Sequence, residues 1–148
     1  MYISAFAISS LPRVIFGDGT LKRVPELAVE FGTRALLVTG ASSLRNSPHG
    51  GELAAGLQMC GITWETLSVA GEPSPQLVDE AAARFRNSGI EVVIGIGGGS
   101  VLDAAKAIAG LLRVDHSVMD YLEGVGPELP YTGPAVPFIA VPTTAGTG

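Results

Sequence analysis

Two hydrophobic patterns follow one another along this chain. Short apolar runs typical of buried strands alternate with longer segments in which apolar residues recur at helical spacing. This alternation is typical of an α/β domain whose helices connect the strands of a parallel sheet. The predicted strands cover residues 13–16, 35–39, 62–69, 92–96 and 138–141. The predicted helices cover residues 21–31, 52–59, a segment that begins after Ser74 and ends at residues 87–89, and 100–112.

Two of these helices carry recognisable start signals. Ser74 is a favourable N-cap residue, and Pro75 suits the first helical position because its missing N–H would have no partner there. Ser100 and Asp103 have the spacing of a capping box, with Asp in place of the usual Glu. We therefore expect one helix to be capped by Ser74 and another to begin at Ser100.

The composition fits one domain that does not cover all of its apolar surface. The chain has 148 residues, of which 47% are hydrophobic and only 16% charged, whereas soluble proteins average roughly 25% charged residues. Such a surplus of apolar residues suggests a face that another domain or subunit covers. We therefore expect the chain to self-associate, as part of a homo-oligomer.

Charge and cysteine content exclude several classes of partner. The net charge is −5 and no run of Lys or Arg occurs, which argues against binding to nucleic acid. The longest apolar stretches are shorter than the roughly 20 residues that cross a bilayer, and no basic residue precedes the apolar N-terminal stretch, so we expect neither a membrane span nor a secretory signal. Cys60 is the only cysteine, which excludes an internal disulfide and favours the cytoplasm.

A glycine loop, defined here as residues 97–99, follows the most apolar predicted strand and leads directly into a helix. Glycines let backbone N–H groups approach a ligand without obstruction by Cβ atoms. The start of the helix adds N–H donors without partners and the positive end of its dipole. Gly97, Gly98 and Gly99 together with Ser100 therefore predict a cradle for a pyrophosphate.

One other interpretation of this segment remains open, and a second is rejected. The glycine loop is also compatible with a tight turn between strand and helix that binds nothing. As a dinucleotide fingerprint, Gly95-x-Gly97-x-x-Ser100 lacks the last glycine and does not lie in the first βα unit. Asp115 and Asp120 are near the offset of a ribose-binding acid, but we expect both to lie in loops after the helix.

A second polar loop follows the last predicted strand. Thr143, Thr144 and Thr147 lie within residues 142–148, here called the threonine loop. Ligands of open α/β sheets bind at the carboxyl ends of the strands, where these hydroxyls are able to contact phosphate, ribose or carboxamide groups. The alternative is a polar loop that hydrogen-bonds only to itself. Because the chain stops where a further helix is expected, we expect it to be a piece of a longer protein.

The two loops together resemble the iron-containing (group III) alcohol dehydrogenases. The sequences Gly-Gly-Gly-Ser-Val-Leu-Asp-Ala-Ala-Lys at 97–106 and Pro-Thr-Thr-Ala-Gly-Thr-Gly at 142–148 carry the resemblance. Shorter pieces follow the order of the family, at residues 13–19, 36–39, 72–75 and 120–124. The resemblance spans nearly the whole chain and covers only the N-terminal, dinucleotide-binding half of such enzymes.

This resemblance implies a metal-dependent oxidoreductase of two domains. The N-terminal half, here residues 1–148, binds NAD or NADP in a Rossmann-like parallel sheet flanked by helices. An all-helical C-terminal half, absent here, holds Fe²⁺ or Zn²⁺ with one Asp and three His. The whole enzyme transfers hydride between the cofactor and a small alcohol or aldehyde. This chain has only His49 and His116, and neither belongs to a cluster of potential ligands, so we expect no metal site and no catalysis by this chain alone.

The resemblance also assigns roles to single residues. Gly98, Gly99 and Ser100 correspond to the pyrophosphate contacts. The three threonines of the threonine loop correspond to contacts with the phosphates, ribose and nicotinamide. Asp103 corresponds to a position near the nicotinamide, or else serves as a favourable negative charge in the first turn of its helix. Ser74 corresponds to an Asn on the adenosine side, although capping alone explains it.

Two further positions bear on the cofactor. Many NAD-dependent members place an Asp directly after the strand that corresponds to residues 35–39, whereas this chain has Gly40, followed by Ser42 and Arg45. Without a carboxylate there, a 2′-phosphate is not repelled, so we favour NADP over NAD. Lys106 is either a phosphate contact or a solvated helix position, and we favour the second.

Two other functions remain possible from the sequence. One is a nucleotide-binding module that stands alone. The other is a relative in the wider superfamily, such as a glycerol dehydrogenase or a dehydroquinate-synthase-like enzyme, which shares the glycine turn but fits the threonine loop less well. The sequence identifies neither the alcohol nor the metal.

Overall fold

Four parallel strands form the centre of the molecule. The computed structural model describes residues 11–41, 44 and 46–145. The strands are β1 (Arg34–Gly40), β2 (Thr63–Val69), β3 (Val92–Gly97) and β4 (Phe138–Pro142), and they lie in the order β2-β1-β3-β4. All three pairings are parallel. The predicted α/β class with a parallel sheet is confirmed.

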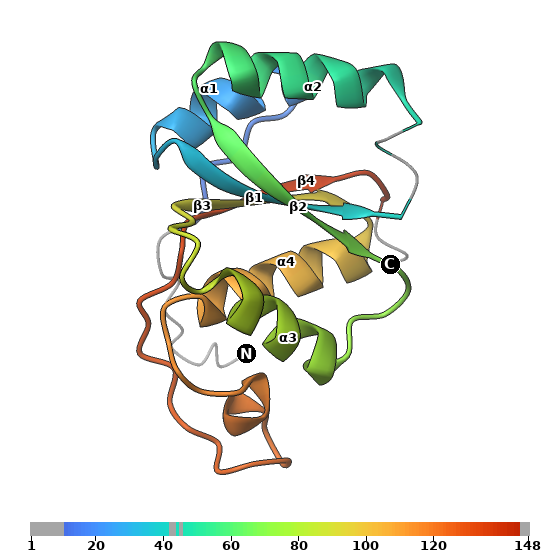
Figure 1. Ribbon diagram of the computed structural model, residues 1–148. Helices are drawn as coiled ribbons and strands as arrows, with labels where there is room; N and C mark the ends of the chain where they lie inside the picture. The colour runs from blue at the N-terminus through green and yellow to red at the C-terminus, as the bar shows by residue number, and fades with distance from the viewer. Residues whose placement is uncertain (1–10, 42–43, 45, 146–148) are drawn as a thin grey trace, which may run out of the picture.

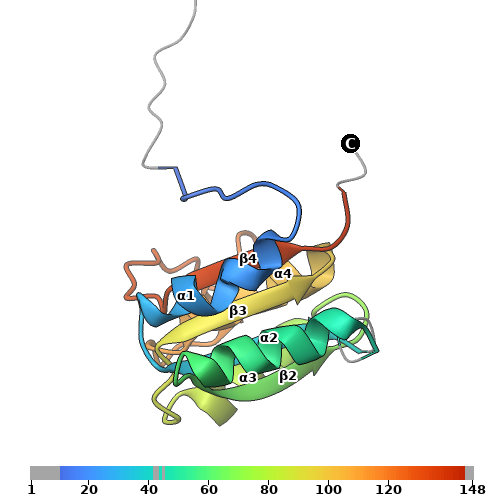
Figure 2. The ribbon, with the colours of Figure 1, turned by 90° about the horizontal axis from the view of Figure 1, so that it is seen from above.

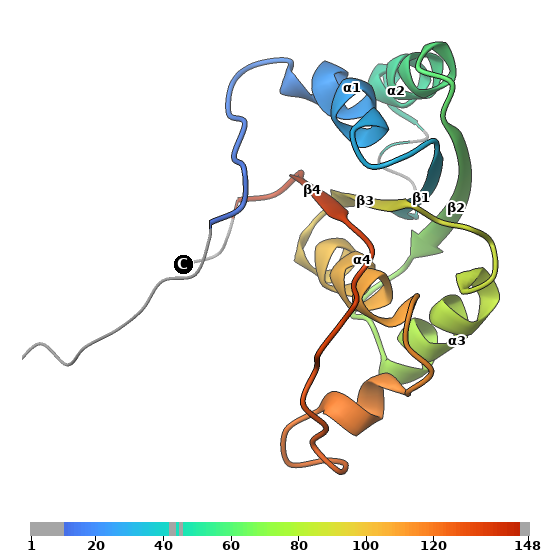
Figure 3. The same cartoon turned by 90° about the vertical axis from the view of Figure 1, so that its left-hand side faces the viewer.

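Helices cover both faces of the sheet (Figure 1). The short 3₁₀-helix η1 (Thr20–Arg23), α1 (Val24–Val29) and α2 (Pro48–Met59) lie on one face, where α1 and α2 run side by side in the view of Figure 2. On the other face lie α3 (Pro75–Phe85) and α4 (Gly99–Leu111). Figure 3 shows that the segment between α4 and β4, which contains the 3₁₀-helix η2 (Val118–Tyr121), projects beyond α3 and α4.

The central strands are buried on both faces because successive side chains point to opposite sides. In β1, Ala35 and Leu37 pack toward α1 and α2, whereas Leu36 and Val38 pack toward α3 and α4. Strand β3 is buried along its whole length. This explains why the apolar runs in the sequence were continuous there. Two separate cores result, one on each face of the sheet.

The structure corrects two predictions near the N-terminus. Residues 13–16 form neither strand nor helix, and Phe16 is 99% exposed. The predicted helix at residues 21–31 is split into η1 and α1. Pro25 causes the split because it has no N–H to donate to the preceding turn, so the α-helix begins around this proline.

Other boundaries moved by a few residues. Helix α2 begins at Pro48 rather than at residue 52, because Pro48 occupies the first helical position after Ser47. The helix after Ser74 has the predicted start, and the chain turns after it at Gly89, whose φ is 68°. Helix η2 was not predicted. No helix of the described residues is long and apolar enough to cross a membrane.

Candidate functional site

The carboxyl ends of all four strands meet at one edge of the sheet because the strands are parallel. The last residue of β1, Gly40, pairs with Val69 of β2, and the last residue of β3, Gly97, pairs with Pro142 of β4. The glycine loop and the threonine loop leave the sheet directly after the second of these pairs. Two segments that are more than 40 residues apart in sequence therefore begin side by side.

Direct contacts hold these two loops together. The main-chain N–H of Thr143 donates a hydrogen bond of 2.9 Å to the carbonyl oxygen of Gly97. The side chain of Thr144 lies against Gly98, so that a Cβ atom at Gly98 would be 3.4 Å from Oγ1 of Thr144. Thr143 and Thr144 are both exposed. The structure thus brings together the glycine loop and two of the three predicted threonines.

The glycines of this segment serve two different purposes. A Cβ atom at Gly97 would lie 2.7 Å from the Cβ atom of Val101, and one at Gly95 would lie 2.8 Å from the Cβ atom of Ala105. These two glycines are needed because α4 packs closely on β3. By contrast, a Cβ atom at Gly99 would meet nothing within 4 Å. Packing therefore explains Gly95 and Gly97, but it does not explain Gly99.

The start of α4 corrects the predicted capping box. The N-cap residue is Gly98, in an extended conformation (φ −74°, ψ −177°), and not Ser100. The carbonyl oxygen of Gly98 accepts hydrogen bonds of 3.1 Å from the amides of Val101 and Leu102. Because the helix begins at Gly99, the side chain of Ser100 is already inside it and is not placed to cap it.

Ser100 instead contacts Glu72, which was not among the predicted site residues. Its hydroxyl donates a hydrogen bond of 2.8 Å to Oε1 of Glu72, in the loop between β2 and α3. Asp103, the other half of the predicted box, is exposed. The sequence held one signal for Glu72, since its loop follows a strand that ends at the same edge of the sheet.

The groups at this edge match the chemistry of a pyrophosphate. The first N–H groups of an α-helix have no partner within the helix and lie at the positive end of its dipole. At α4 these groups belong to the glycine loop and Ser100, and no Cβ atom stands in front of Gly99. The hydroxyls of Thr143 and Thr144 add two further donors at the same place.

The remaining predicted site residues have varied positions. Gly40 ends β1, next to the strand that carries the glycine loop. Ser74 caps α3, and its Oγ accepts a hydrogen bond of 3.2 Å from the amide of Leu77. Lys106 is exposed, as expected for a solvated position. The predicted contacts at Ser42 and Thr147, and Arg45 beside Gly40, lie outside the described residues.

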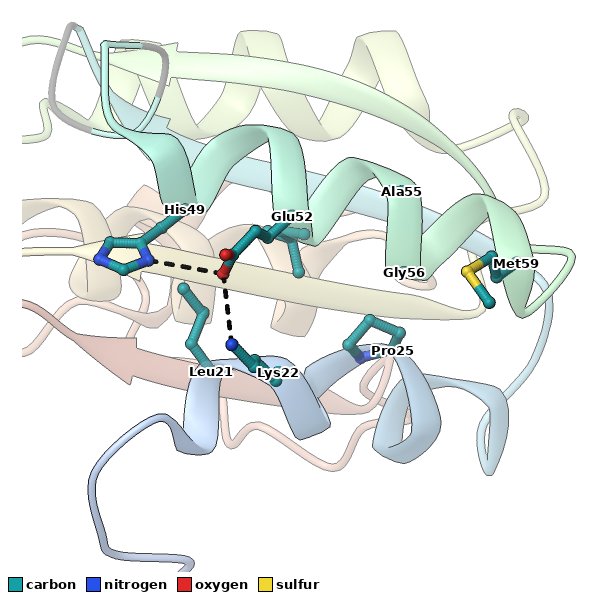
Figure 4. A pocket seen from close by; sticks show the side chains of 9 residues that line it. Leu21, Lys22, Pro25, His49, Glu52, Ala55, Gly56 and Met59 are labelled. Carbon is teal, nitrogen blue, oxygen red and sulfur yellow. Dashed lines mark ion pairs between the residues drawn. The ribbon is translucent and has the colours of Figure 1, made fainter.

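The two histidines pair with separate acidic residues. His49, at the start of α2, pairs with Glu52 at 3.7 Å, and Lys22 approaches the same carboxylate at 3.9 Å (Figure 4). These residues line a largely apolar hollow of about 340 Å³ between η1, α1 and α2. His116 lies 3.5 Å from Asp120 near η2. Among residues 11–41, 44 and 46–145, no three His, Cys, Asp or Glu side chains cluster as metal ligands would.

A parallel sheet covered on both faces, with a glycine loop that enters a helix at its carboxyl edge, defines a Rossmann-like α/β domain. Residues 12–148 match the sequence model of the iron-containing alcohol dehydrogenases. The chain belongs to this family, and the resemblance seen in the two loops is confirmed.

Individual relatives agree with this assignment. The chain is 36% identical over 138 residues to a probable alcohol dehydrogenase, EutG, of Escherichia coli strain K12. This match covers 93% of this chain and 34% of the relative. It is 32% identical to a probable NADH-dependent butanol dehydrogenase of Bacillus subtilis, over 92% of this chain and 34% of that protein. The chain thus spans about a third of the length of the curated relatives that it matches.

Solved structures show the same fold. An NADH-dependent butanol dehydrogenase of Thermotoga maritima superposes with a TM-score of 0.83 at 27% identity, over 97% of this chain and 35% of that one. A sulfoacetaldehyde reductase of Bifidobacterium kashiwanohense, solved in complex with NAD⁺, superposes with a TM-score of 0.74 at 26% identity, over 88% of this chain and 34% of that one.

Proposed function

We propose that this chain is the dinucleotide-binding part of a metal-dependent alcohol dehydrogenase or aldehyde reductase. The observation that carries the proposal is the junction of the glycine and threonine loops at the carboxyl edge of the sheet, where the amide of Thr143 bonds to Gly97. The family supplies the ligand class, since its relatives include NADH-dependent enzymes and one solved with NAD⁺.

Each part of the junction has its own task in this proposal. The amides of Gly98, Gly99 and Ser100 bind the pyrophosphate, because they are the free donors at the start of α4. The hydroxyls of Thr143 and Thr144 orient the half of the dinucleotide that lies over β4. When bound, the nicotinamide ring donates or accepts the hydride. Gly97 contributes through packing and through its carbonyl oxygen.

For the adenosine half we propose a preference for NADP over NAD. Gly40 ends β1 without a carboxylate, so nothing at that position repels a 2′-phosphate. We place Ser74 on this side only through the family, because its hydroxyl already caps α3. Asp103 is exposed one turn inside α4, and we assign it to the nicotinamide side or to the helix dipole.

The metal and the substrate belong, in this proposal, to the part of the enzyme that this chain does not include. We expect Fe²⁺ or Zn²⁺ to be held there and to polarise the oxygen of the alcohol or aldehyde. The 148-residue chain is therefore expected to be inactive by itself. Turnover of an alcohol by this chain with added Fe²⁺ or Zn²⁺ would contradict that expectation.

Isothermal calorimetry with NADPH and NADH, without metal, tests the cofactor proposal. Binding of both, with NADPH tighter, is the expected result. Tighter NADH would leave the dinucleotide site intact and overturn the interpretation of Gly40. If neither binds, the assignment of the two loops as a preformed dinucleotide site is wrong. Inorganic sulfate, which lacks both nucleosides, serves as the control ligand.

We further propose that the chain associates with itself. Several large apolar side chains are exposed, among them Leu11 at 79%, Phe16 at 99% and Met59 at 90%. Exposed apolar surface of this kind is often covered by another domain or subunit. Light scattering at increasing concentration is expected to show a rising mass, and a constant monomer mass would refute the proposal.

A further inference from the structure

A carboxylate lies beside the proposed pyrophosphate cradle. Glu72 follows Gly71, whose positive φ of 72° bends the chain in the loop between β2 and α3. The turn directs Oε1 of Glu72 to the hydroxyl of Ser100, at 2.8 Å. Since Ser100 is the second residue of α4, the carboxylate lies next to the N–H groups that start this helix.

No positive side chain neutralises this carboxylate in the part of the chain that the structure describes. The ion pairs there involve other acids, namely Glu30, Glu52, Glu65, Asp115 and Asp120. The positive end of the α4 dipole attracts an anion to the glycine loop, whereas the charge of Glu72 opposes it. The balance between these two effects depends on how much negative charge the anion carries.

We propose that Glu72 determines the charge selectivity of the glycine loop, so that the loop accepts a bridging pyrophosphate and rejects a terminal phosphate. This inference rests on the proposed function. In the pyrophosphate of a dinucleotide each phosphate carries one negative charge, because each is bonded to a ribose and to the bridging oxygen. A nucleoside diphosphate ends in a terminal phosphate that carries close to one additional charge at neutral pH. The carboxylate therefore disfavours ADP more than a dinucleotide.

The hydroxyl of Ser100 has a positioning role in this arrangement. Because it donates its hydrogen to Glu72, it fixes the carboxylate at the start of α4 instead of donating to a phosphate. The pyrophosphate is then left to the backbone amides of the glycine loop. One extra unit charge about 6 Å away changes affinity by about threefold at the dielectric constant of water, and by up to about a hundredfold at the lower effective value near a protein surface, at low salt.

Two ligands and two variants isolate this effect. ADP and ADP-ribose share adenosine and both phosphates, and differ in whether the second phosphate is terminal or esterified by a second ribose. Glu72→Gln removes the charge but keeps an oxygen that accepts from Ser100. Glu123→Gln makes the same charge change in the loop after η2, beyond the C-terminal end of α4 and therefore far from the glycine loop. Amide shifts of the ¹⁵N-labelled chain report both folding and binding at Gly98, Gly99 and Ser100.

The expected result is a ratio of the Kd for ADP to the Kd for ADP-ribose that falls about fivefold in Glu72→Gln and stays unchanged in Glu123→Gln. The difference is expected to shrink at about 0.5 M salt because screening weakens the repulsion. If NADH and ADP-ribose shift the glycine-loop amides but the ratio is the same in Glu72→Gln, this inference is wrong and the proposed function stands. If neither ligand shifts those amides in any variant, the proposed function fails, and this inference fails with it.

Discussion

The amide of Thr143 donates a 2.9 Å hydrogen bond to the carbonyl oxygen of Gly97 and so joins the ends of β3 and β4. The glycine loop and the threonine loop, which form the two halves of the proposed cofactor site, are therefore joined by a main-chain hydrogen bond. The bond continues the ladder in which Gly97 pairs with Pro142. A backbone hydrogen bond of this kind is independent of the side chains, so the threonine hydroxyls remain available for a ligand.

The glycine loop allows a test in which stability and binding move in different directions. Gly99→Ala is expected to keep or slightly raise stability, by about 0.5 kcal/mol, because the new methyl group meets no atom and alanine favours the helix. The same methyl group would stand in the proposed cradle, so affinity for NAD(P)H is expected to fall at least tenfold. Calorimetry and urea denaturation measure the two effects. An unchanged affinity would show that the dinucleotide does not pass over Gly99.

Gly97→Ala is the matched comparison at the neighbouring glycine. Its Cβ atom would lie 2.7 Å from Val101 Cβ, inside the packed junction of β3 and α4. We expect a loss of about 1–3 kcal/mol in the free energy of unfolding, the usual cost of overpacking. A stability equal to that of the wild type would show that α4 moves away without cost.

Close packing of α4 on β3 predicts a compensating pair. Gly95→Ala is expected to cost about 1–3 kcal/mol, because the new methyl group would lie 2.8 Å from the Cβ atom of Ala105. Ala105→Gly removes that atom and is expected to restore part of the loss, although glycine inside a helix costs about 1 kcal/mol by itself. Urea denaturation of the single and double variants gives the coupling energy. Strictly additive effects would contradict the contact.

Asp79 is expected to hold η2 on α3. One of its oxygens accepts from the hydroxyl of Ser117, and the other accepts a hydrogen bond of 2.7 Å from the amide of Val118. Asp79→Ala leaves both donors without this partner and is expected to cost about 1–3 kcal/mol. The exposed neighbour Glu80→Ala is the control, with a change within about 0.5 kcal/mol. Equal losses in the two variants would show that Asp79 does not anchor η2.

From the hydrogen bond and the raised pKa of Tyr131 we expect the fold to lose stability at alkaline pH. Its hydroxyl donates a hydrogen bond of 2.9 Å to the carbonyl oxygen of Gly110, and partial burial, together with the nearby Tyr121, raises the pKa of this phenol above 10.0. A raised pKa means that folding favours the neutral form. The stabilising effect is present below about pH 10 and is lost as pH rises through the raised pKa.

Tyr131→Phe tests this relation. We expect it to cost about 0.5–1.5 kcal/mol at pH 8, the net value of one hydrogen bond. Above the raised pKa the variant and the wild type are expected to converge in stability. Thermal unfolding between about pH 8 and 11 measures both curves. A constant difference over that range would show that ionisation of Tyr131 does not affect the fold.

The sequence predicted those features that depend on local pattern. The parallel sheet followed from apolar runs separated by helical segments, and Ser74 caps α3 because the signal of serine followed by proline is contained in two adjacent residues. Pro25 likewise indicates the start of α1. The apolar residues at helical spacing on both sides of it nevertheless led to the prediction of one continuous helix.

Features that depend on partners distant in sequence were not predictable. Residues 13–16 have the composition of a strand, but no neighbouring strand pairs with them in the described part of the chain. Ser100 has the spacing of a cap, yet the packing of β3 against α4 lets the helix begin one residue earlier. The hydrogen bond that joins Glu72 to the site is made with a residue 28 positions away. Such contacts arise from the fold and leave no periodic pattern in the sequence.

The described strands give β4 a single neighbour, β3. The register of β4 is consequently set by one ladder, and a slip of one residue would turn its side chains to the opposite face and separate Thr143 from Gly97. A transfer of the glycine and threonine loops into another parallel sheet would therefore have to include both β3 and β4. The position of the threonine loop depends on the pairing of β4 with β3.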